Sequence, residues 1–242
     1  MTNIGILTTL NDELAPFLIK KINKLKNVNF FLIISKTKKN YKLKFSKIFK
    51  ERTGDYFLKY NLDLSNSNIR LPTYLVNSHN CKEFHKLIKK KNIKFLYNSD
   101  TPIKINKSTI KKVKGIINIH PGILPNYRGS TCPEWTLFNN DPLGITAHLM
   151  DENYDTGPII KIKYLKFKKQ SIRDYKDIRI KIYLLTLSLA KKIFKNIHKI
   201  KTYKQDEYNS KYFKVIDSSS LLKIKNKIKQ KKIHFNKKNL II

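Results

Sequence analysis

Two short segments of the chain bring together side chains that could perform acid–base chemistry. Asn118 and His120 close an apolar run at residues 115–120, and Asp155 lies in a polar loop at residues 151–157. Residues two apart on a strand share a face, and the carboxyl ends of parallel strands form the ligand crevice of an open α/β sheet. An amide, an imidazole and a carboxylate there can donate hydrogen bonds and move protons. Taken alone, a histidine at a strand end is more often structural, and Asp-Thr-Gly is more often a turn.

The elements that must position these groups follow from the alternation of short apolar runs with longer amphipathic stretches. This alternation is typical of an α/β protein with crossover helices. We therefore predict a Rossmann-like, open twisted sheet, mostly parallel, with helices on both faces and a short C-terminal extension. The predicted strands are residues 3–8, 29–35, 72–76, 93–97, 115–120, 144–150 and 158–167. The predicted helices are about residues 12–26, 81–90, 108–112 and 171–198.

The domain organisation predicted from the same pattern is one catalytic domain at residues 1–200 and a lysine-rich extension at residues 201–242. The final run, residues 221–238, is read as either a basic helix or a partly disordered tail. Residues 36–70 have weak periodicity and are interpreted as an insertion or as a helix with a loop.

The chain is strongly basic, with 51 lysines and arginines against 17 acids and a formal net charge of +34. Such a charge suggests nucleic-acid binding, because lysine and arginine neutralise phosphates. Only five of the basic residues are arginines, and lysine, isoleucine and asparagine are abundant together. That joint bias favours a solvated lysine surface over a dedicated nucleic-acid partner, and either explanation is compatible with an anionic small substrate.

Cysteine content and the N-terminus bear on location and metals. Cys81 and Cys132 are far apart and form no CxxC pair, so neither a disulfide framework nor a metal site is expected. The chain starts without a basic and then apolar leader pattern, and no apolar run approaches the roughly 20 residues that span a bilayer. We therefore expect a cytoplasmic protein with no membrane partner.

A multi-part motif over about 45 residues favours a catalytic role for Asn118, His120 and Asp155 over a structural one. It reads Asn118-x-His120-Pro, then Leu-Pro-x-x-Arg128-Gly, then Gly-x-Thr-x-His148, then Met-Asp-x-x-x-Asp155-Thr-Gly-Pro-Ile-Ile. This arrangement resembles the core of the 10-formyltetrahydrofolate-dependent formyltransferases. The resemblance outside this segment is confined to the alternating α/β order of the N-terminal half.

The resemblance implies transfer of a formyl group from 10-formyltetrahydrofolate to an amine, with Asn118, His120 and Asp155 as the catalytic residues. The amide of Asn118 and a protonated His120 would donate hydrogen bonds to the tetrahedral oxyanion. Asp155 would orient His120 or relay the amine's proton through water to the departing folate nitrogen. No covalent enzyme intermediate is needed, so Cys132 is not expected to be a nucleophile.

The resemblance also implies contacts for the two substrates. The pterin is expected against the loop of Asp151, Glu152, Asn153 and Tyr154 and against Ile103 and Ile105, although residues 98–102 lack the glycines expected there. Three further residues are candidates for acceptor binding, each with a structural alternative: Arg128 as a ligand of a phosphate or carboxylate or as an organiser of its loop, Trp135 at the start of a helix as pocket wall or core, and Tyr212 as a stacking residue or part of a surface strand. His148 alternates with core residues and is predicted to be structural.

Several related enzyme families have features that this sequence lacks, and these features bear on which amine is the acceptor. Glycinamide ribonucleotide formyltransferases cradle a phosphate with a glycine-rich loop after the first strand, whereas residues 8–13 contain no glycine and two acids. Methionyl-tRNA formyltransferases add a C-terminal β-barrel, for which residues 201–242 are too few. Formyltetrahydrofolate hydrolases add an N-terminal regulatory domain, for which the predicted organisation leaves no room.

The preferred acceptor is therefore a small-molecule amine, most simply the amino group of a nucleotide-linked amino sugar. The glycinamide ribonucleotide and methionyl-tRNA activities are kept as alternatives, as is a catalytically inactive binding module on the same fold. The sequence leaves a homodimer open.

Overall fold

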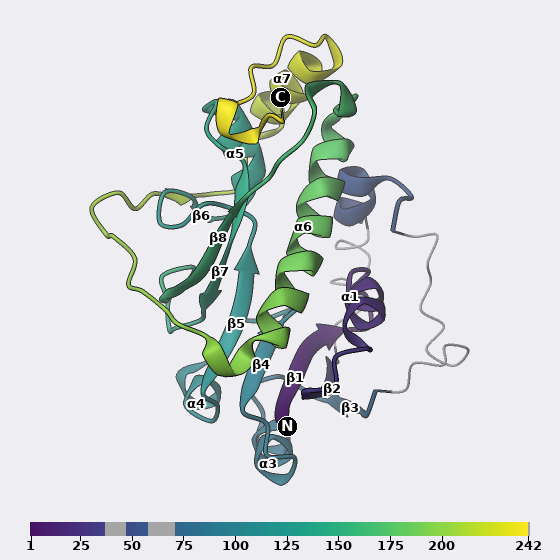
Figure 1. The fold of residues 1–242 in the computed structure, drawn as a ribbon, viewed down its shortest axis with the longest axis vertical. Coiled ribbons are helices and arrows are strands. Elements are labelled where there is room, and N and C mark those ends of the chain that lie inside the picture. The colour runs from purple at the N-terminus through teal and green to yellow at the C-terminus, as the bar shows by residue number, and fades with distance from the viewer. Residues whose placement is uncertain (37–46, 58–70, 242) are drawn as a thin grey trace. The chain divides into compact units, whose positions relative to one another are not determined.

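The computed structural model of this protein describes residues 1–36, 47–57 and 71–241. In the described residues the main sheet has the strand order β3-β2-β1-β4-β5-β7-β8 (Figure 1). Its strands are β1 (Thr2–Thr9), β2 (Val28–Ser35), β3 (Thr73–Val76), β4 (Phe95–Asn98), β5 (Gly115–His120), β7 (Gly144–Leu149) and β8 (Ile159–Tyr164). The pairs β1–β2, β1–β4, β2–β3 and β4–β5 are parallel, and β7–β8 is antiparallel. The predicted mostly parallel α/β class is confirmed.

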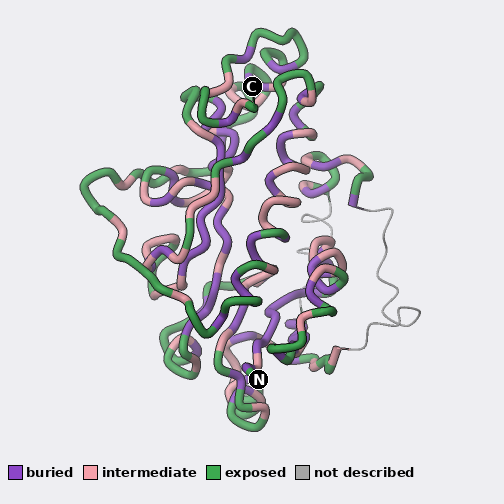
Figure 2. The backbone as a smooth tube through the Cα atoms, viewed as in Figure 1, coloured by how far each residue is buried: buried purple, intermediate pink, exposed green. Residues whose placement is uncertain are grey.

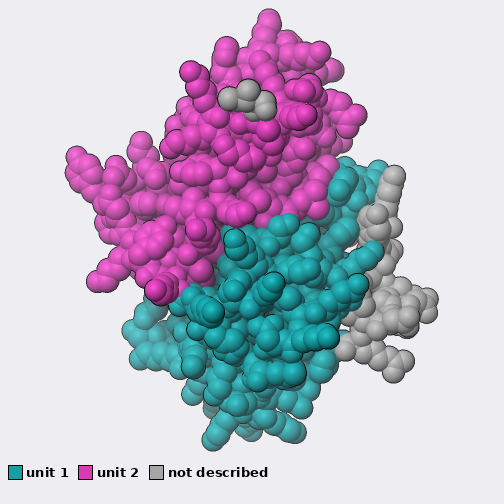
Figure 3. Space-filling view, viewed as in Figure 1, with its two compact units in different colours: residues 1–118, 149–152, 187–200 teal, residues 119–148, 153–186, 201–242 magenta. Residues whose placement is uncertain are grey.

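The chain divides into two compact units, coloured separately in Figure 3. Unit 1 comprises residues 1–118, 149–152 and 187–200. It contains β1 to β4, most of β5, and the helices α1 (Ala15–Ile22), α3 (Lys82–Lys90) and α4 (Lys107–Ile110). A short helix also spans residues 47–53. Strands β1, β2, β4 and β5 are mostly buried, as a parallel sheet covered by helices requires (Figure 2). They supply the buried core residues Leu7, Ile33, Leu96 and Ile116.

Helix α1 begins later than the sequence predicts, at Ala15 and not near Asp12. The Asp12 carboxylate lies before the helix and accepts hydrogen bonds from the backbone N–H groups of Leu14 and Ala15, both at 3.0 Å. These are two of the amides that a helix N-terminus leaves unpaired. Asp12 therefore ends the loop after β1 by capping the helix with the chain's own carboxylate.

Unit 2 comprises residues 119–148, 153–186 and 201–242. It contains β7, β8, α5 (Cys132–Phe138) and α7 (Ser218–Lys229), together with a small parallel sheet of β6 (Arg128–Gly129) and β9 (Tyr212–Phe213). The long helix α6 (Tyr175–Lys195) contributes its first half to unit 2 and its second half to unit 1. Three short 3-10 turns complete the elements: η1 (Lys169–Ser171), η2 (Ile197–Lys199) and η3 (Lys237–Asn239).

The described part of the C-terminal segment, residues 201–241, packs inside unit 2 through several contacts. Arg128 N donates to Lys211 O, and Ser130 N donates to Phe213 O. The buried Asn239 side chain donates to the carbonyl oxygens of Leu143 and Leu165. The basic-helix reading of the tail is confirmed for residues 218–229. The boundary between a catalytic domain and an extension at residue 200 stays a prediction.

The structure bears on two further expectations, the start of the helix that contains Trp135 and the segment at residues 36–70. Trp135 was predicted to begin its helix, but α5 begins three residues earlier at Cys132, because Thr131 has a left-handed backbone (φ 50°) and Pro133 favours the first turn. Much of the segment interpreted as an insertion, residues 37–46 and 58–70, lies outside the described residues. Across the part of the chain that the structure describes, no helix is both long and apolar enough to cross a membrane.

Candidate active site

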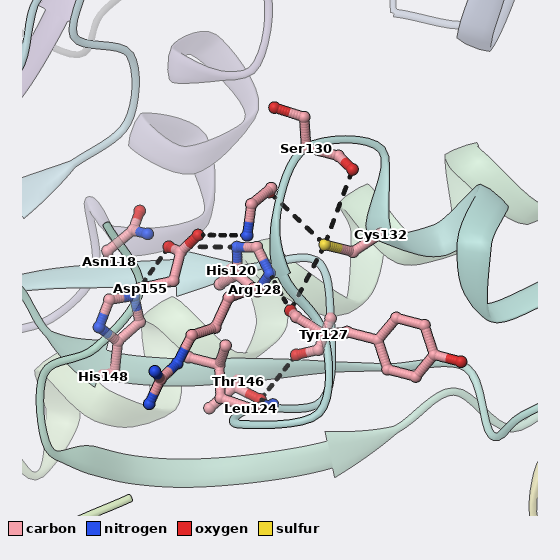
Figure 4. A network of polar contacts seen from close by, with 12 residues as sticks. Asn118, His120, Leu124, Tyr127, Arg128, Ser130, Cys132, Thr146, His148 and Asp155 are labelled. Carbon is pink, nitrogen blue, oxygen red and sulfur yellow. Dashed lines mark hydrogen bonds and ion pairs between the residues drawn. The ribbon is translucent and has the colours of Figure 1, made fainter. Parts of the chain in front are cut away.

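His120 is the last residue of β5, and the loop after it holds the imidazole in place (Figure 4). Its side chain is 4% exposed, and its Nε2 lies 2.7 Å from the carbonyl oxygen of Tyr127. Gly122 makes this approach possible, since a Cβ there would lie 2.7 Å from that carbonyl oxygen and 2.9 Å from Nε2. Thr146 on β7 ties the loop down, because its hydroxyl donates to Gly122 O and accepts from Leu124 N. The His-Pro-Gly and Gly-x-Thr motifs thus build one rigid turn.

Asp155 meets His120 from the loop between β7 and β8. Its Oδ1 lies 3.3 Å from His120 Nδ1, and its Oδ2 accepts the backbone N–H of Gly129 at 2.9 Å. Asp155 has a left-handed backbone (φ 59°), a conformation that costs energy for a residue with a Cβ and that is found at functional sites. The structure thus brings together two of the three predicted catalytic residues.

His148 joins the same carboxylate and was predicted to be structural. It lies at the end of β7, is 1% exposed, and places its Nε2 3.6 Å from Asp155 Oδ1. Its position in the Gly-x-Thr-x-His part of the motif was the available signal. A buried strand position can face a carboxylate as well as a hydrophobic core, and that His148 is structural stays a prediction.

The charges of this group follow from burial and from mutual attraction. Burial lowers the pKa of His120, and the negative charge of Asp155 offsets part of that effect. Burial alone would raise the pKa of Asp155, but the charge of His120 and hydrogen bonds from His148 and Gly129 hold it below its ordinary value. Asp155 is therefore an ionised carboxylate near neutral pH, beside an imidazole that is mostly neutral.

Asn118, the third predicted catalytic residue, is two positions before His120 on β5, at the boundary of unit 1. Its Oδ1 accepts a hydrogen bond from Asn98 Nδ2 at 3.1 Å, which orients the amide so that Nδ2 is its donor side. Asn98 ends β4, the neighbouring strand, and its own Oδ1 is buried without a protein partner in the described residues. A ligand N–H would satisfy that oxygen.

Residues of the C-terminal segment hold the Asp155 loop, which the sequence did not reveal. Gln205 donates through its Nε2 to the carbonyl oxygens of Asp155 (2.8 Å) and Gly157 (2.7 Å). Its Oε1 accepts two hydrogen bonds from the guanidinium of Arg128, which also binds both carboxylate oxygens of Glu207. No local pattern in the sequence signals a pairing 50 residues apart.

The other candidates for substrate binding occupy these positions. The guanidinium of Arg128 is buried and bonded to Gln205 and Glu207, which favours the loop-organising alternative. The Trp135 ring lies 5.5 Å from that of Phe213, and its N–H donates to Lys214 O. Tyr212 is 60% exposed. Substrate contacts by these three residues stay a prediction.

The residues predicted to contact the pterin are spread over both units. Ile103 is exposed, whereas Ile105 is buried in the core of unit 1. Asp151 and Glu152 belong to unit 1, and Glu152 pairs with Lys107 at 2.7 Å. Asn153 and Tyr154 belong to unit 2, and Tyr154 is 57% exposed. Their roles in cofactor binding stay a prediction.

Two alternative chemistries find little support in this region. Cys132 is buried beneath the loop, and burial together with the charge of Asp155 raises the pKa of its thiol to about 12. Such a thiol is protonated at neutral pH and is a poor nucleophile. Among the described residues, no three His, Cys, Asp or Glu side chains are grouped so that they could hold a metal ion.

Comparison with known proteins bears on what the site does. Residues 101–177, which contain Asn118, His120, His148 and Asp155, match the family model described as formyl transferase. Over this segment the chain is similar to the formyl transferase family. The fold is similar to that of a sugar N-formyltransferase from a Shewanella species, which superposes with a TM-score of 0.61 at 17% identity, over 88% of this chain and 77% of that one.

Curated proteins are similar to this chain over short stretches. The GDP-perosamine N-formyltransferase of Brucella melitensis biotype 1 is 46% identical over 48 residues, 19% of this chain and 18% of that protein. The methionyl-tRNA formyltransferase of Wolbachia pipientis subsp. Culex pipiens is 34% identical over 99 residues, 40% of this chain and 32% of that protein. The matched regions therefore span less than a third of either relative.

Proposed function

We propose that this protein transfers the formyl group of 10-formyltetrahydrofolate to the primary amine of an amino sugar carried on a nucleotide. The observation that carries the proposal is the buried contact between His120 Nδ1 and the Asp155 carboxylate, 3.3 Å apart, inside the segment that matches the formyl transferase model. An imidazole and an ionised carboxylate, fixed at the carboxyl end of a strand, suit transfer between two nitrogen atoms because both proton movements can use them.

The proposed reaction proceeds in two steps. The unprotonated amine attacks the formyl carbon, a new C–N bond forms, and the carbonyl oxygen becomes an oxyanion. Asn118 Nδ2 donates to that oxygen, and a protonated His120 is the second donor once its ring releases the Tyr127 carbonyl. The bond from the formyl carbon to N10 of the folate then breaks, while the amine's proton passes through Asp155 and water to N10. The products are a formamide and tetrahydrofolate.

A sugar acceptor is preferred over glycinamide ribonucleotide because of the loop after β1. Phosphate binding at a helix N-terminus uses backbone N–H groups. At the start of α1 these groups donate to Asp12, and the second oxygen of Asp12 accepts hydrogen bonds from Thr8 and Ser99. A phosphate would have to displace a buried carboxylate of the chain, which disfavours this class of acceptor.

Relatives support the sugar class. The GDP-perosamine enzyme is 46% identical over 48 residues, and an N-formyltransferase of Helicobacter canadensis with a similar fold (TM-score 0.58, 18% identity) was solved with folinic acid and dTDP-3-aminofucose. The methionyl-tRNA activity is the second candidate, since the match to the Wolbachia protein runs over 99 residues.

The test is release of tetrahydrofolate from 10-formyltetrahydrofolate with a panel of GDP-, dTDP- and UDP-linked amino sugars, and with charged initiator tRNA. We expect turnover with a sugar, lost in His120→Asn and kept in His234→Asn, a matched change at an exposed histidine of the tail. Formylation of the tRNA alone would replace the sugar proposal with the second candidate. Turnover with neither would leave the protein as a binding module.

A further inference from the structure

A cavity of about 590 Å³ lies in unit 1, apart from the candidate catalytic residues. It is formed by the second half of α3, the turn that leads into β4, and the turn that leads from α4 into β5. Six lysines line it: Lys86, Lys89, Lys94, Lys111, Lys112 and Lys114. Ile88, Ile93 and Val113 supply apolar surface between them.

Within the described residues, no carboxylate lies at ion-pair distance from the lysines of this cavity. The lining contains no aspartate or glutamate. Among the described residues, Lys50 and Lys107 pair with carboxylates, whereas none of the six cavity lysines does. Cationic groups gathered around one concave surface repel each other and raise the local concentration of anions. On a surface that is only rich in lysine, the charges would be spread evenly. Here six of the eleven residues that line one cavity are lysines.

His85 gives the cavity a group that responds to the charge of a ligand. Its Nε2 lies 2.8 Å from Thr109 Oγ1, so the ring is anchored to α4. Burial and the positive charge of Lys112 both lower the pKa of His85. An anion bound among the lysines would oppose the second effect.

The cavity is also separated from the candidate active site along the strands. Lys94 and Lys114 precede β4 and β5, and the backbone N–H of Lys114 donates to Lys94 O at 2.7 Å. Asn98 and Asn118 lie at or near the carboxyl ends of the same two strands. The cavity and the two asparagines therefore lie at opposite ends of β4 and β5.

We propose that this cavity binds a compact, multiply charged phosphate ligand with the bulk of a di- or triphosphate group. Its volume lies within the range of small-molecule sites. Six flexible ammonium groups suit phosphate oxygens as point-charge partners, without the bidentate geometry that arginine would impose. The ligand is distinct from the substrates of formyl transfer.

Inorganic tripolyphosphate is the probe, and its binding to the full chain is measured by calorimetry at about 0.1 M salt, where exposed charges are partly screened. We expect one site per chain. A triple variant with Lys89→Gln, Lys111→Gln and Lys114→Gln should bind about tenfold more weakly or worse, since it loses three ion pairs. The matched control carries Lys223→Gln, Lys227→Gln and Lys229→Gln on α7, which removes the same charge elsewhere and should bind within about twofold of the parent.

Two further readouts separate a site from general attraction. Tripolyphosphate should raise the pKa of His85, followed by NMR, in the parent and not in the cavity variant. Formyl transfer should be unchanged in that variant, so failure here and failure of the proposed function are distinguishable. Equal weakening in both triple variants would overturn the proposal. So would binding of an oligonucleotide about a hundredfold tighter than tripolyphosphate, because it would identify a nucleic-acid surface.

Discussion

At the scale of single residues, Asp155 contacts more of the site than any other residue described above, because its two oxygens have different partners. Oδ1 faces the imidazoles of His120 and His148, and Oδ2 is held by the Gly129 N–H. An ionised carboxylate between two histidines stabilises a positive charge on either ring. The position of a proton in the site therefore depends on the charge of this one residue.

Replacing Asp155 with asparagine should change both the chemistry and the titration of the site. Without the carboxylate, burial loses the larger of the two effects that oppose it and only the hydrogen bond to the Tyr127 carbonyl remains, so the pKa of His120 should fall further below its ordinary 6.5. Formyl transfer should drop by about 10²- to 10⁴-fold, the usual contribution of a proton-transferring group. NMR titration of the imidazole carbons and tetrahydrofolate release measure the two effects. A rise in the pKa of His120 in this variant would contradict the assigned geometry.

Gln205 should act as a positioning residue, because it bonds the Asp155 loop and not the reacting atoms. Gln205→Leu removes both hydrogen bonds to the carbonyl oxygens of Asp155 and Gly157, and we expect kcat to fall about tenfold with KM for the folate little changed. Gln205→Glu keeps an acceptor for Arg128 but places a carboxylate beside those oxygens, so it should be at least as damaging. Full activity in both variants would show that the Asp155 loop keeps its position without the hydrogen bonds of Gln205.

At the scale of elements, the interior strands were predictable because composition and burial coincide there. The run at residues 115–120 was predicted with its final bounds, since it is apolar, precedes Pro-Gly and is buried on both sides. Ends governed by capping were less accurate, as α1 shows, because the capping role of Asp12 depends on a side-chain rotamer. The parallel pair β6–β9 could not be predicted, because it joins two-residue strands about 80 positions apart.

His79 links a loop to the sheet and gives the fold a dependence on pH. Its Nε2 lies 3.0 Å from Ile33 O on β2, and burial lowers its pKa to about 4. Between pH 6.5 and 4 the unfolded chain binds this proton and the folded chain does not, so stability is lost as the pH falls. The free energy of unfolding should decrease by about 3 kcal/mol over that window from this group.

The measurement is urea unfolding at several pH values between about 4 and 6.5, in the parent and in His79→Gln. The glutamine keeps an N–H donor for Ile33 O but does not titrate, so its curve should be flatter. His234→Gln, at an exposed position, is the matched control and should follow the parent. Parallel curves for all three proteins would remove His79 as the origin of the acid sensitivity.

At the scale of the whole molecule, a formal net charge of +34 on 242 residues makes self-repulsion a general cost of folding. Salt should relieve it, because the screening length falls from about 10 Å at 0.1 M to about 3 Å at 1 M. We expect the melting temperature to rise with potassium chloride, by about 2–4 °C for each 1 kcal/mol of relieved repulsion. Differential scanning fluorimetry is sufficient. The α7 triple variant, with three charges fewer, should show a shallower rise, and a melting temperature that falls with salt would rule out repulsion as the main effect of these charges on stability.

The path of the chain from β6 to β9 also has a meaning during synthesis on the ribosome. Arg128 and Asp155 leave the exit tunnel well before Gln205 and Glu207, which complete their hydrogen bonds. A nascent chain in which Gln205 and Glu207 are still enclosed already exposes the segment that holds Asn118, His120 and Asp155, but its aspartate loop is not yet fastened. The proposed activity would thus reach its full level only after Gln205 and Glu207 have left the tunnel and bonded to Arg128 and the aspartate loop.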